Sequence, residues 1–263
     1  MPEFSPTLLA LDFDGVLCDG LHEYFQSSKR TYQLIWPETP DSKLDACAED
    51  FYRLRPVIES GWEMPLLLRA LVLNIEPEKI TNQWTVISEQ LTTDEKVDKT
   101  QLGTQLDQVR DQFIATELDD WLRLHRFFPG VLDQLSAWLK SPTLLLYVVT
   151  TKEGRFVRQL LQNHNLTFPP EQIIGKEIRQ PKVKTLQQLC HRHQCDPIQL
   201  WFVEDLAKTL NSVAQAPEFA KTPLFLADWG YNTATVRSRV KTEGRLHVLN
   251  LTQFTGEFGT WLL

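Results

Sequence analysis

The stretch LLALDFDGV (Leu8–Val16) decides how this chain is interpreted. A short apolar run ends abruptly in two aspartates one residue apart, and a glycine follows. An apolar run of this length that ends at a glycine turn predicts a buried strand. In open parallel α/β sheets, ligands bind just beyond the carboxyl ends of the strands. We therefore expect Asp12 and Asp14 to lie at a functional site, although a single aspartate here would equally suit a helix cap.

The composition excludes several classes of partner. The 263-residue chain has a formal net charge of −7, which argues against general binding to nucleic acid or to anionic membranes. No apolar stretch approaches the ~20 residues of a membrane span, and the N-terminus lacks the pattern of a signal peptide. The few scattered cysteines favour a cytoplasmic location. A zinc site around Cys190 and Cys195 is disfavoured, because the C-H-x-H-x-C spacing fits no common zinc pattern.

The pattern of apolar residues divides the chain into two kinds of sequence. From about residue 20 to 126 almost nothing resembles a strand, and helical periodicity is found over 22–35, 64–73, 77–91 and 102–118. Beyond residue 128, strands and helices alternate, which predicts a parallel sheet covered on both faces. We expect a doubly wound, Rossmann-like α/β core (1–18 and 127–263) with an all-helical domain (19–126) inserted after the first strand.

Polar groups follow three of the predicted core strands. Asp12 and Asp14 follow the first, Thr150 follows the run 143–149, and Glu204 and Asp205 follow the run 200–203. Because parallel strands bring their carboxyl ends to one edge, we expect these groups to converge. Four carboxylates in one cleft repel each other unless a cation or a proton intervenes. A set of oxygen ligands of this kind suits Mg²⁺.

These residues resemble the four sequence motifs of the haloacid dehalogenase-like (HAD) superfamily. The resemblance is to its phosphatase branch with a helical C1-type cap, which includes phosphoglycolate phosphatase-like and β-phosphoglucomutase-like proteins. It covers nearly the whole chain, and the helical segment 19–126 corresponds to the cap. In chain order, the matching residues are Asp12-x-Asp14-Gly15-Val16, Thr150, Lys182 and Glu204-Asp205.

The resemblance implies a Mg²⁺-dependent phosphatase that hydrolyses a small phosphate monoester through an aspartyl-phosphate. Asp12 would be the nucleophile. Asp14 would protonate the leaving oxygen and then deprotonate the attacking water. Thr150 would hydrogen-bond the phosphoryl oxygens, with Thr151 as a further substrate contact. Lys182 would neutralise charge between the phosphate and the nucleophile.

The resemblance also implies a ligand set for Mg²⁺. The Asp12 carboxylate, the Asp14 backbone carbonyl and Asp205 would bind the ion, and Glu204 is a further candidate. The role of Glu204 stays open, because the family often has an aspartate about four residues after the acid of its fourth motif, where this chain has Thr209.

The lysine of the third motif is not uniquely defined. Lys182 is the preferred candidate, but Val183 follows it where the family often has proline. Lys176 and Lys184 are the competing candidates. Each of the three could instead be a solvated surface lysine.

One stretch of the helical segment has the residue types of a substrate-recognition element. Arg53 and Arg55 suit bidentate contacts with a carboxylate, and Trp62 adds an aromatic surface. We expect these three residues to contact the part of the substrate remote from the phosphate. In the alternative interpretation, the two arginines are surface residues paired with Glu59 or Asp50.

The same motifs occur in other activities of the superfamily. A dehalogenase would not need an acid at Asp14, and a phosphonate hydrolase would need a cap lysine, for which Lys29 is the main candidate. A phosphomutase shares the acidic motifs and remains the alternative enzyme. A catalytically idle HAD-like binding module is the non-enzymatic alternative. We expect a small-molecule phosphate ester as partner, neither nucleic acid nor membrane, and a monomer or homodimer. The turn 229–231 resembles one in related phosphatases and is assigned no chemistry.

Overall fold

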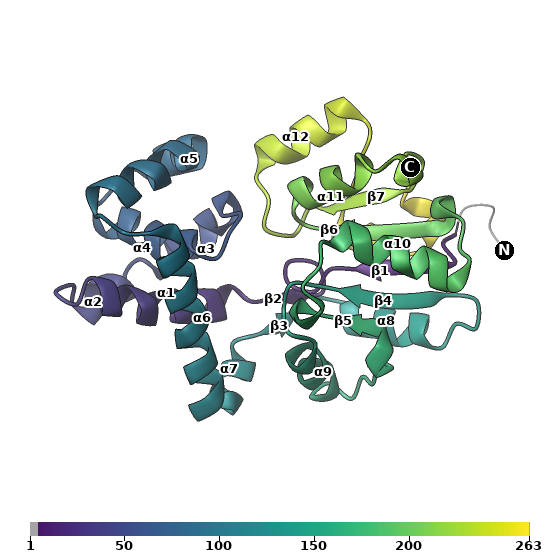
Figure 1. Ribbon diagram of the computed structural model, residues 1–263, viewed down its shortest axis with the longest axis horizontal. Coiled ribbons are helices and arrows are strands. Elements are labelled where there is room, and N and C mark those ends of the chain that lie inside the picture. Colours follow the sequence, from purple (N-terminus) through teal and green to yellow (C-terminus); the bar gives the residue numbers. More distant parts are fainter. Residues whose placement is uncertain (1–4, 263) are drawn as a thin grey trace. The chain divides into compact units, whose positions relative to one another are not determined.

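The computed structural model describes residues 5–262, which form two compact units. One unit comprises the chain up to Asp19 together with the chain from Phe127 onwards, and the other comprises Gly20–Arg126 (Figure 1). Across the described residues, no helix is both long and apolar enough to cross a lipid bilayer.

The first unit is built on a six-stranded sheet with the strand order β5-β4-β1-β6-β7-β8. All of its strand pairs are parallel. This confirms the parallel sheet that the alternation of strands and helices predicts. The strands are β1 (Leu8–Leu11), β4 (Leu145–Val149), β5 (Ile173–Ile174), β6 (Leu200–Glu204), β7 (Leu224–Ala227) and β8 (His247–Leu249).

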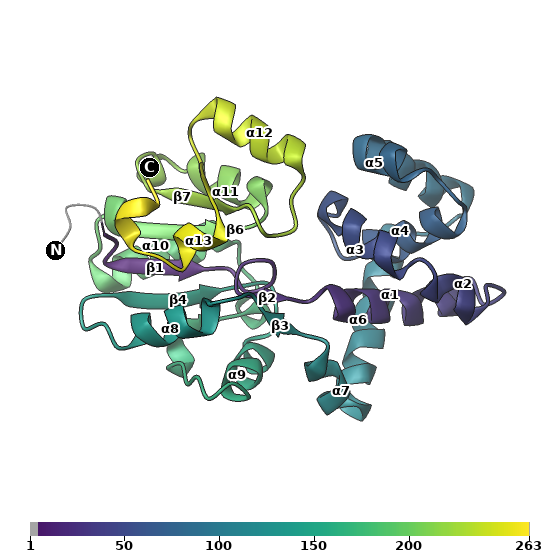
Figure 2. The ribbon, with the colours of Figure 1, turned by 180° about the vertical axis from the view of Figure 1, so that it is seen from behind.

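Helices cover both faces of this sheet. Helices α10 and α11 lie in front of it in Figure 1, and α8 and α13 lie in front when the molecule is seen from behind in Figure 2. The doubly wound core is thereby confirmed, although the sequence analysis did not predict α12 or α13. The helices of this unit are α8 (Val131–Leu139), α9 (Gly154–Gln162), α10 (Lys182–His193), α11 (Ala207–Ala214), α12 (Ala234–Glu243) and α13 (Leu251–Phe254).

The two-residue period of the strands assigns alternate side chains to opposite faces. Leu8 and Ala10 of β1, and Phe202 of β6, pack in one apolar cluster with residues of α10 and α11. On the other face, the Trp201 ring contacts the Trp261 ring, with the centroids 5.6 Å apart. Burial of each large apolar side chain contributes about 1.5–3 kcal/mol. On the face that packs against α10, the alternation continues past the apolar side chains. It reaches Asp12 after Ala10 of β1 and Glu204 after Phe202 of β6.

The second unit is helical between Leu21 and Arg123. Its long helices α1, α4 and α6 pack against one another. Two short strands, β2 (Cys18–Asp19) and β3 (Arg126–Phe127), pair where the chain leaves and rejoins the sheet unit. The helices are α1 (Leu21–Ile35), α2 (Asp41–Asp45), α3 (Ala48–Leu54), α4 (Glu63–Val72), α5 (Pro77–Asp94), α6 (Lys99–Thr116) and α7 (Leu118–Arg123).

A buried carboxylate ties three of these helices together. Glu23 of α1 is fully buried, and its Oε1 lies 2.7 Å from Nε of Arg110 in α6. The same oxygen accepts hydrogen bonds from Ser27 Oγ at 2.6 Å and from Trp121 Nε1 of α7 at 3.3 Å. An ionised carboxylate is stable in the interior only with partners of this kind. The network therefore holds α6 and α7 against α1.

Candidate active site

Lys182 joins two buried carboxylates at the carboxyl edge of the sheet. Its Nζ lies 2.7 Å from Oδ1 of Asp12 and 2.7 Å from Oε2 of Glu204. Asp12 directly follows β1, and its N–H donates to the carbonyl of Val203 at 2.9 Å, so the pairing with β6 continues into this residue. Helix α10 begins at Lys182 and covers the same face of the sheet. The first residue of α10 is thus placed over the ends of β1 and β6.

Glu204 has both carboxylate oxygens engaged by donors of the protein. Oε1 accepts from the backbone N–H groups of Asp205 at 3.2 Å and Leu206 at 3.1 Å. Oε2 accepts from Lys182. The residue is 2% exposed, so these partners hold it in one orientation. Its geometry is that of a residue that anchors the lysine.

Two glycines allow the backbone to approach Asp205 closely. A Cβ on Gly15 would lie 2.1 Å from Oδ2 of Asp205, and one on Gly230 would lie 2.3 Å from its Cβ. Gly15 also has φ +81°, which favours glycine. The N–H of Tyr231 donates to Oδ2 of Asp205 at 2.7 Å, and Nδ2 of Asn232 donates to its carbonyl at 3.0 Å. The turn to which the sequence analysis assigned no chemistry therefore orients this carboxylate.

Lys152 is a residue of the site that the sequence analysis missed. Its Nζ lies 3.1 Å from Oδ1 and 3.2 Å from Oδ2 of Asp14. Its backbone N–H donates to Oγ1 of Thr150 at 3.1 Å. Thr150 is buried and Thr151 is exposed. The sequence offered one signal for it: in the triplet Thr150-Thr151-Lys152, a cation stands two residues after the candidate hydroxyl group that follows β4.

Burial shifts the proton equilibria of the central groups. Burial, and secondarily repulsion from Glu204, raise the pKa of Asp12 to about 7, although Lys182 opposes the shift. Burial also raises the pKa of Glu204. Burial disfavours the charged form of Lys182, but attraction to the two carboxylates outweighs it and raises the pKa of the ammonium group. The lysine is thus held as a cation, while Asp12 needs further positive charge to be fully ionised at neutral pH.

The donor set fits a divalent cation. Asp12, Glu204 and Asp205 are buried, and each offers an oxygen within 4.8 Å of the others. With Asp14 included, four carboxylates gather here around the ammonium groups of Lys152 and Lys182. Carboxylate oxygens without nitrogen or sulfur ligands suit Mg²⁺. A bound divalent ion would favour the ionised form of Asp12.

The competing lysines do not share this geometry. Lys176 and Lys184 are exposed, whereas the side chain of Lys182 is 11% exposed and contacts Asp12. The structure therefore brings together Asp12, Asp14, Thr150, Lys182, Glu204 and Asp205 at one edge of the sheet unit.

The three predicted recognition residues of the helical unit have local partners. Arg53 pairs with Asp50 at 2.6 Å and is exposed, as in the surface interpretation of this residue. Arg55 donates from Nη1 to the carbonyl of Ile58 at 3.0 Å. The ammonium group of Lys99 lies over the Trp62 ring, 4.9 Å from the ring centroid. A role of Arg53, Arg55 and Trp62 in substrate binding stays a prediction.

Comparison with solved structures agrees with this architecture. The chain is similar to a protein of Bacteroides fragilis named as a haloacid dehalogenase-like hydrolase, with 16% identity and a TM-score of 0.60 over 95% of this chain and 100% of that one. The fold is that of the haloacid dehalogenase-like hydrolases. No protein-family model and no curated protein matches the sequence.

Further structures share this haloacid dehalogenase-like fold. A protein of Clostridium acetobutylicum, named as a predicted phosphatase, is 14% identical with a TM-score of 0.58, over 95% of this chain and 97% of that one. A protein of Haemophilus somnus, named as a predicted phosphoglycolate phosphatase, is 18% identical with a TM-score of 0.52, over 86% and 87%. At these identities, the comparisons establish the haloacid dehalogenase-like fold.

Proposed function

We propose that this protein is a Mg²⁺-dependent phosphatase that hydrolyses a small phosphate monoester through an aspartyl-phosphate on Asp12. The observation that carries the proposal is the position of Lys182. Its ammonium group bridges the buried Asp12 and Glu204 beside a cluster of carboxylates that fits a divalent ion.

In the first step, a carboxylate oxygen of Asp12 attacks phosphorus and the ester P–O bond breaks. Asp14 gives a proton to the leaving oxygen, which departs as an alcohol. Lys182 holds Asp12 in place and stabilises the negative charge on the phosphoryl group. Oγ1 of Thr150 already accepts a hydrogen bond from the N–H of Lys152, so its own proton can be donated to a phosphoryl oxygen.

In the second step, Asp14 takes a proton from water as the water oxygen attacks phosphorus. The bond between phosphorus and Asp12 breaks, and inorganic phosphate leaves. Lys152 keeps the carboxylate of Asp14 in one place through both steps. Mg²⁺, held by Asp12 and Asp205 with the backbone carbonyl of Asp14, would shield the anionic nucleophile from the anionic phosphate.

The helical unit Gly20–Arg126 is proposed to act as a cap. A helical lid excludes water from an aspartyl-phosphate and restricts the size of the substrate. The proposal therefore includes a small-molecule phosphate ester as the substrate. Arg53, Arg55 and Trp62 are proposed to contact its part remote from the phosphate.

The decisive experiment compares wild type with Asp12→Asn on a panel of small phosphate esters, with Mg²⁺ and with EDTA. Loss of the nucleophile is expected to lower kcat by about 10³-fold or more, as for other nucleophile deletions. Asp133→Asn on α8 makes the same chemical change at an exposed aspartate and should retain full activity. Mg²⁺-dependent turnover by Asp12→Asn at the wild-type rate would refute the proposal.

A further inference from the structure

A cationic pocket of about 280 Å³ lies beside Thr150 and Lys182 in the sheet unit. Besides these two residues, Lys176 and Arg179 line it. None of the described residues that line it is an aspartate or a glutamate. Lys182 is paired with Asp12 and Glu204, so the cationic character of the pocket comes from Lys176 and Arg179.

The loop between β5 and α10, which forms one wall of the pocket, is anchored to its neighbours. Glu177 accepts a hydrogen bond from the N–H of Gly154 at 3.1 Å, which engages its carboxylate at the start of α9. A Cβ on Gly175 would lie 2.4 Å from the same nitrogen, so the loop lies directly against α9. Gln180 donates from Nε2 to Oγ1 of Thr185 in α10 at 2.9 Å. The wall is therefore preformed.

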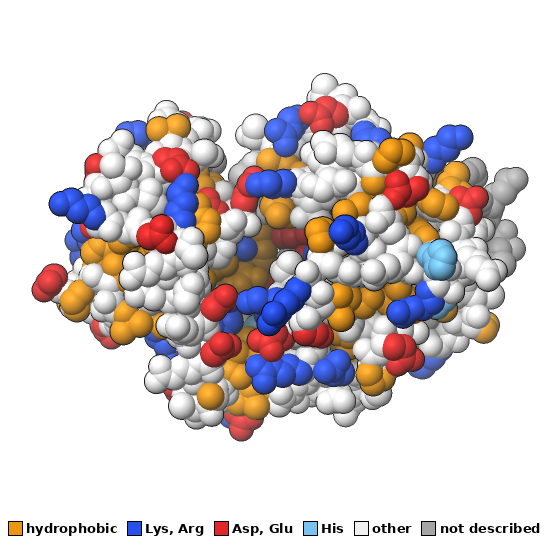
Figure 3. All heavy atoms as spheres, viewed as in Figure 1, with side chains coloured by type: hydrophobic (Ala, Val, Ile, Leu, Met, Phe, Trp, Pro, Cys, Tyr) orange, Lys and Arg blue, Asp and Glu red, His pale blue; other side chains and the backbone are white. Residues whose placement is uncertain are grey.

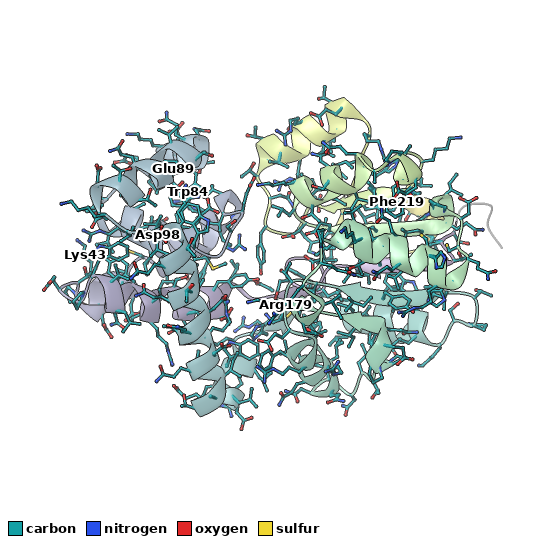
Figure 4. All side chains as sticks on the ribbon, viewed as in Figure 1. Lys43, Trp84, Glu89, Asp98, Arg179 and Phe219 are labelled. Atoms are coloured by element: carbon teal, nitrogen blue, oxygen red, sulfur yellow. The ribbon has the colours of Figure 1, made fainter. Side chains whose placement is uncertain are left out.

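Arg179 has a left-handed backbone conformation, which glycine adopts more readily than other residues. Its φ is +52°, in the left-handed region. The side chain is exposed at the carboxyl edge of the sheet (Figure 4). Basic side chains, interspersed with acidic ones, appear on the same face in Figure 3. A strained residue that keeps a long cationic side chain is consistent with a function for that side chain.

We propose that this pocket binds a second anionic group of the substrate through Arg179 and Lys176. The inference rests on the proposed phosphatase function and narrows its substrate to a phosphate monoester that carries a further carboxylate or phosphate. In the proposed reaction the phosphoryl group would lie at Thr150 and Lys182, which also line the pocket. Arg179 lines the same pocket, and its planar guanidinium group suits bidentate contacts with a second carboxylate or phosphate of the substrate.

The test uses pairs of esters that differ in one anionic group: 3-phosphoglycerate with glycerol 3-phosphate, and fructose 1,6-bisphosphate with fructose 6-phosphate. Wild type is expected to show at least tenfold higher kcat/KM for the more anionic member of one pair. Arg179→Gly should abolish that preference mainly through KM, and Lys176→Met should reduce it. Glycine suits the left-handed backbone, so Arg179→Gly removes the side chain without straining the fold.

The matched control is Arg239→Ala on α12, which removes one exposed cation that does not line the pocket. It should leave the preference unchanged. An equal loss of preference in Arg239→Ala would show a general effect of net charge and would overturn the proposal. The proposal would also be overturned if the preference survived in the Arg179→Gly/Lys176→Met double variant, or if these substitutions changed only inhibition by inorganic phosphate.

A binding measurement separates this proposal from the proposed function. Titration of 3-phosphoglycerate and fructose 1,6-bisphosphate into Asp12→Asn protein should give an affinity for one of them that falls at least fivefold on adding Arg179→Gly. If wild type hydrolyses no ester but this loss of affinity is seen, the phosphatase proposal fails and the pocket stands. If wild type hydrolyses esters and Arg179→Gly has the same substrate preference as wild type, the pocket proposal fails and the proposed function stands.

Discussion

Lys152 Nζ lies 3.1 Å from Oδ1 and 3.2 Å from Oδ2 of Asp14, so one ammonium group faces both oxygens of the carboxylate. The two residues are 138 positions apart in the chain. Asp14 has to present its carboxyl group to a leaving oxygen and then to water, and Lys152 limits where that carboxyl group can lie.

Lys152→Met is predicted to lower kcat by about 10–100-fold while the protein stays folded. A misplaced acid loses most of its catalytic contribution, because displacement by about 1 Å can cost ~10²-fold in rate. Steady-state kinetics on the best ester of the panel, together with circular dichroism, provide the measurement. Lys152→Arg retains the positive charge and should recover part of the activity. Wild-type kcat in Lys152→Met would show that Asp14 does not depend on this partner.

Glu204→Gln and Asp205→Asn are predicted to affect different kinetic properties, kcat in the first variant and the Mg²⁺ requirement in the second. Asp205→Asn removes a proposed ligand and should raise the Mg²⁺ concentration for half-maximal activity at least tenfold. Glu204 has both oxygens engaged by Lys182 and backbone N–H groups. Glu204→Gln should therefore lower kcat and change the Mg²⁺ requirement by less than threefold. Activity measured against Mg²⁺ concentration distinguishes the variants, and equal shifts would place Glu204 among the metal ligands.

The stability of the metal-free protein is predicted to fall as pH rises from 5 to 8. The pKa of Asp12 is raised from its ordinary 3.8 to about 7, so the folded state binds this proton more tightly than the unfolded state does. The free energy of unfolding contributed by Asp12 is therefore present below pH 4 and lost as pH rises through 7. At about 1.4 kcal/mol per pKa unit, the loss amounts to at most about 4.5 kcal/mol.

Urea denaturation in EDTA at several pH values measures this effect. Asp12→Asn should show a flatter dependence on pH and should be more stable than wild type at pH 8. Mg²⁺ should restore the stability of wild type at pH 8, because it binds the ionised carboxylate. Parallel pH profiles for the two proteins in EDTA would show that Asp12 titrates normally.

Gly15→Ala is predicted to abolish activity, and Gly244→Ala to leave it intact. Both glycines have positive φ, +81° and +67°, so both substitutions strain the backbone by roughly 1–2 kcal/mol. Only at Gly15 would the new Cβ collide with Asp205, 2.1 Å from its Oδ2, since nothing lies within 4 Å at Gly244. Thermal denaturation and turnover of both variants test the difference. An active Gly15→Ala would show that the position of Asp205 is not critical.

The sequence by itself determined the α/β core, because its strands are short apolar runs whose burial dominates local structure. The predicted apolar run 200–203 lies within the strand β6 (Leu200–Glu204). Helices with weaker apolar patterns were not predicted. Helix α12, with Val240 as its buried residue, is one of them. Because so little of α12 is buried, its apolar residues do not recur at a clear helical spacing in the sequence.

The arrangement of the site was decided by tertiary structure. Lys176, Lys182 and Lys184 lie within nine positions of one another and are indistinguishable as residue types. Lys182 alone of the three contacts Asp12, with its Nζ 2.7 Å from Oδ1, because α10 begins at this residue over the ends of β1 and β6. Contacts such as Lys152 with Asp14 depend on which strands are neighbours in the sheet. Strand order is a property of the packed core, so no local pattern of residues encodes it.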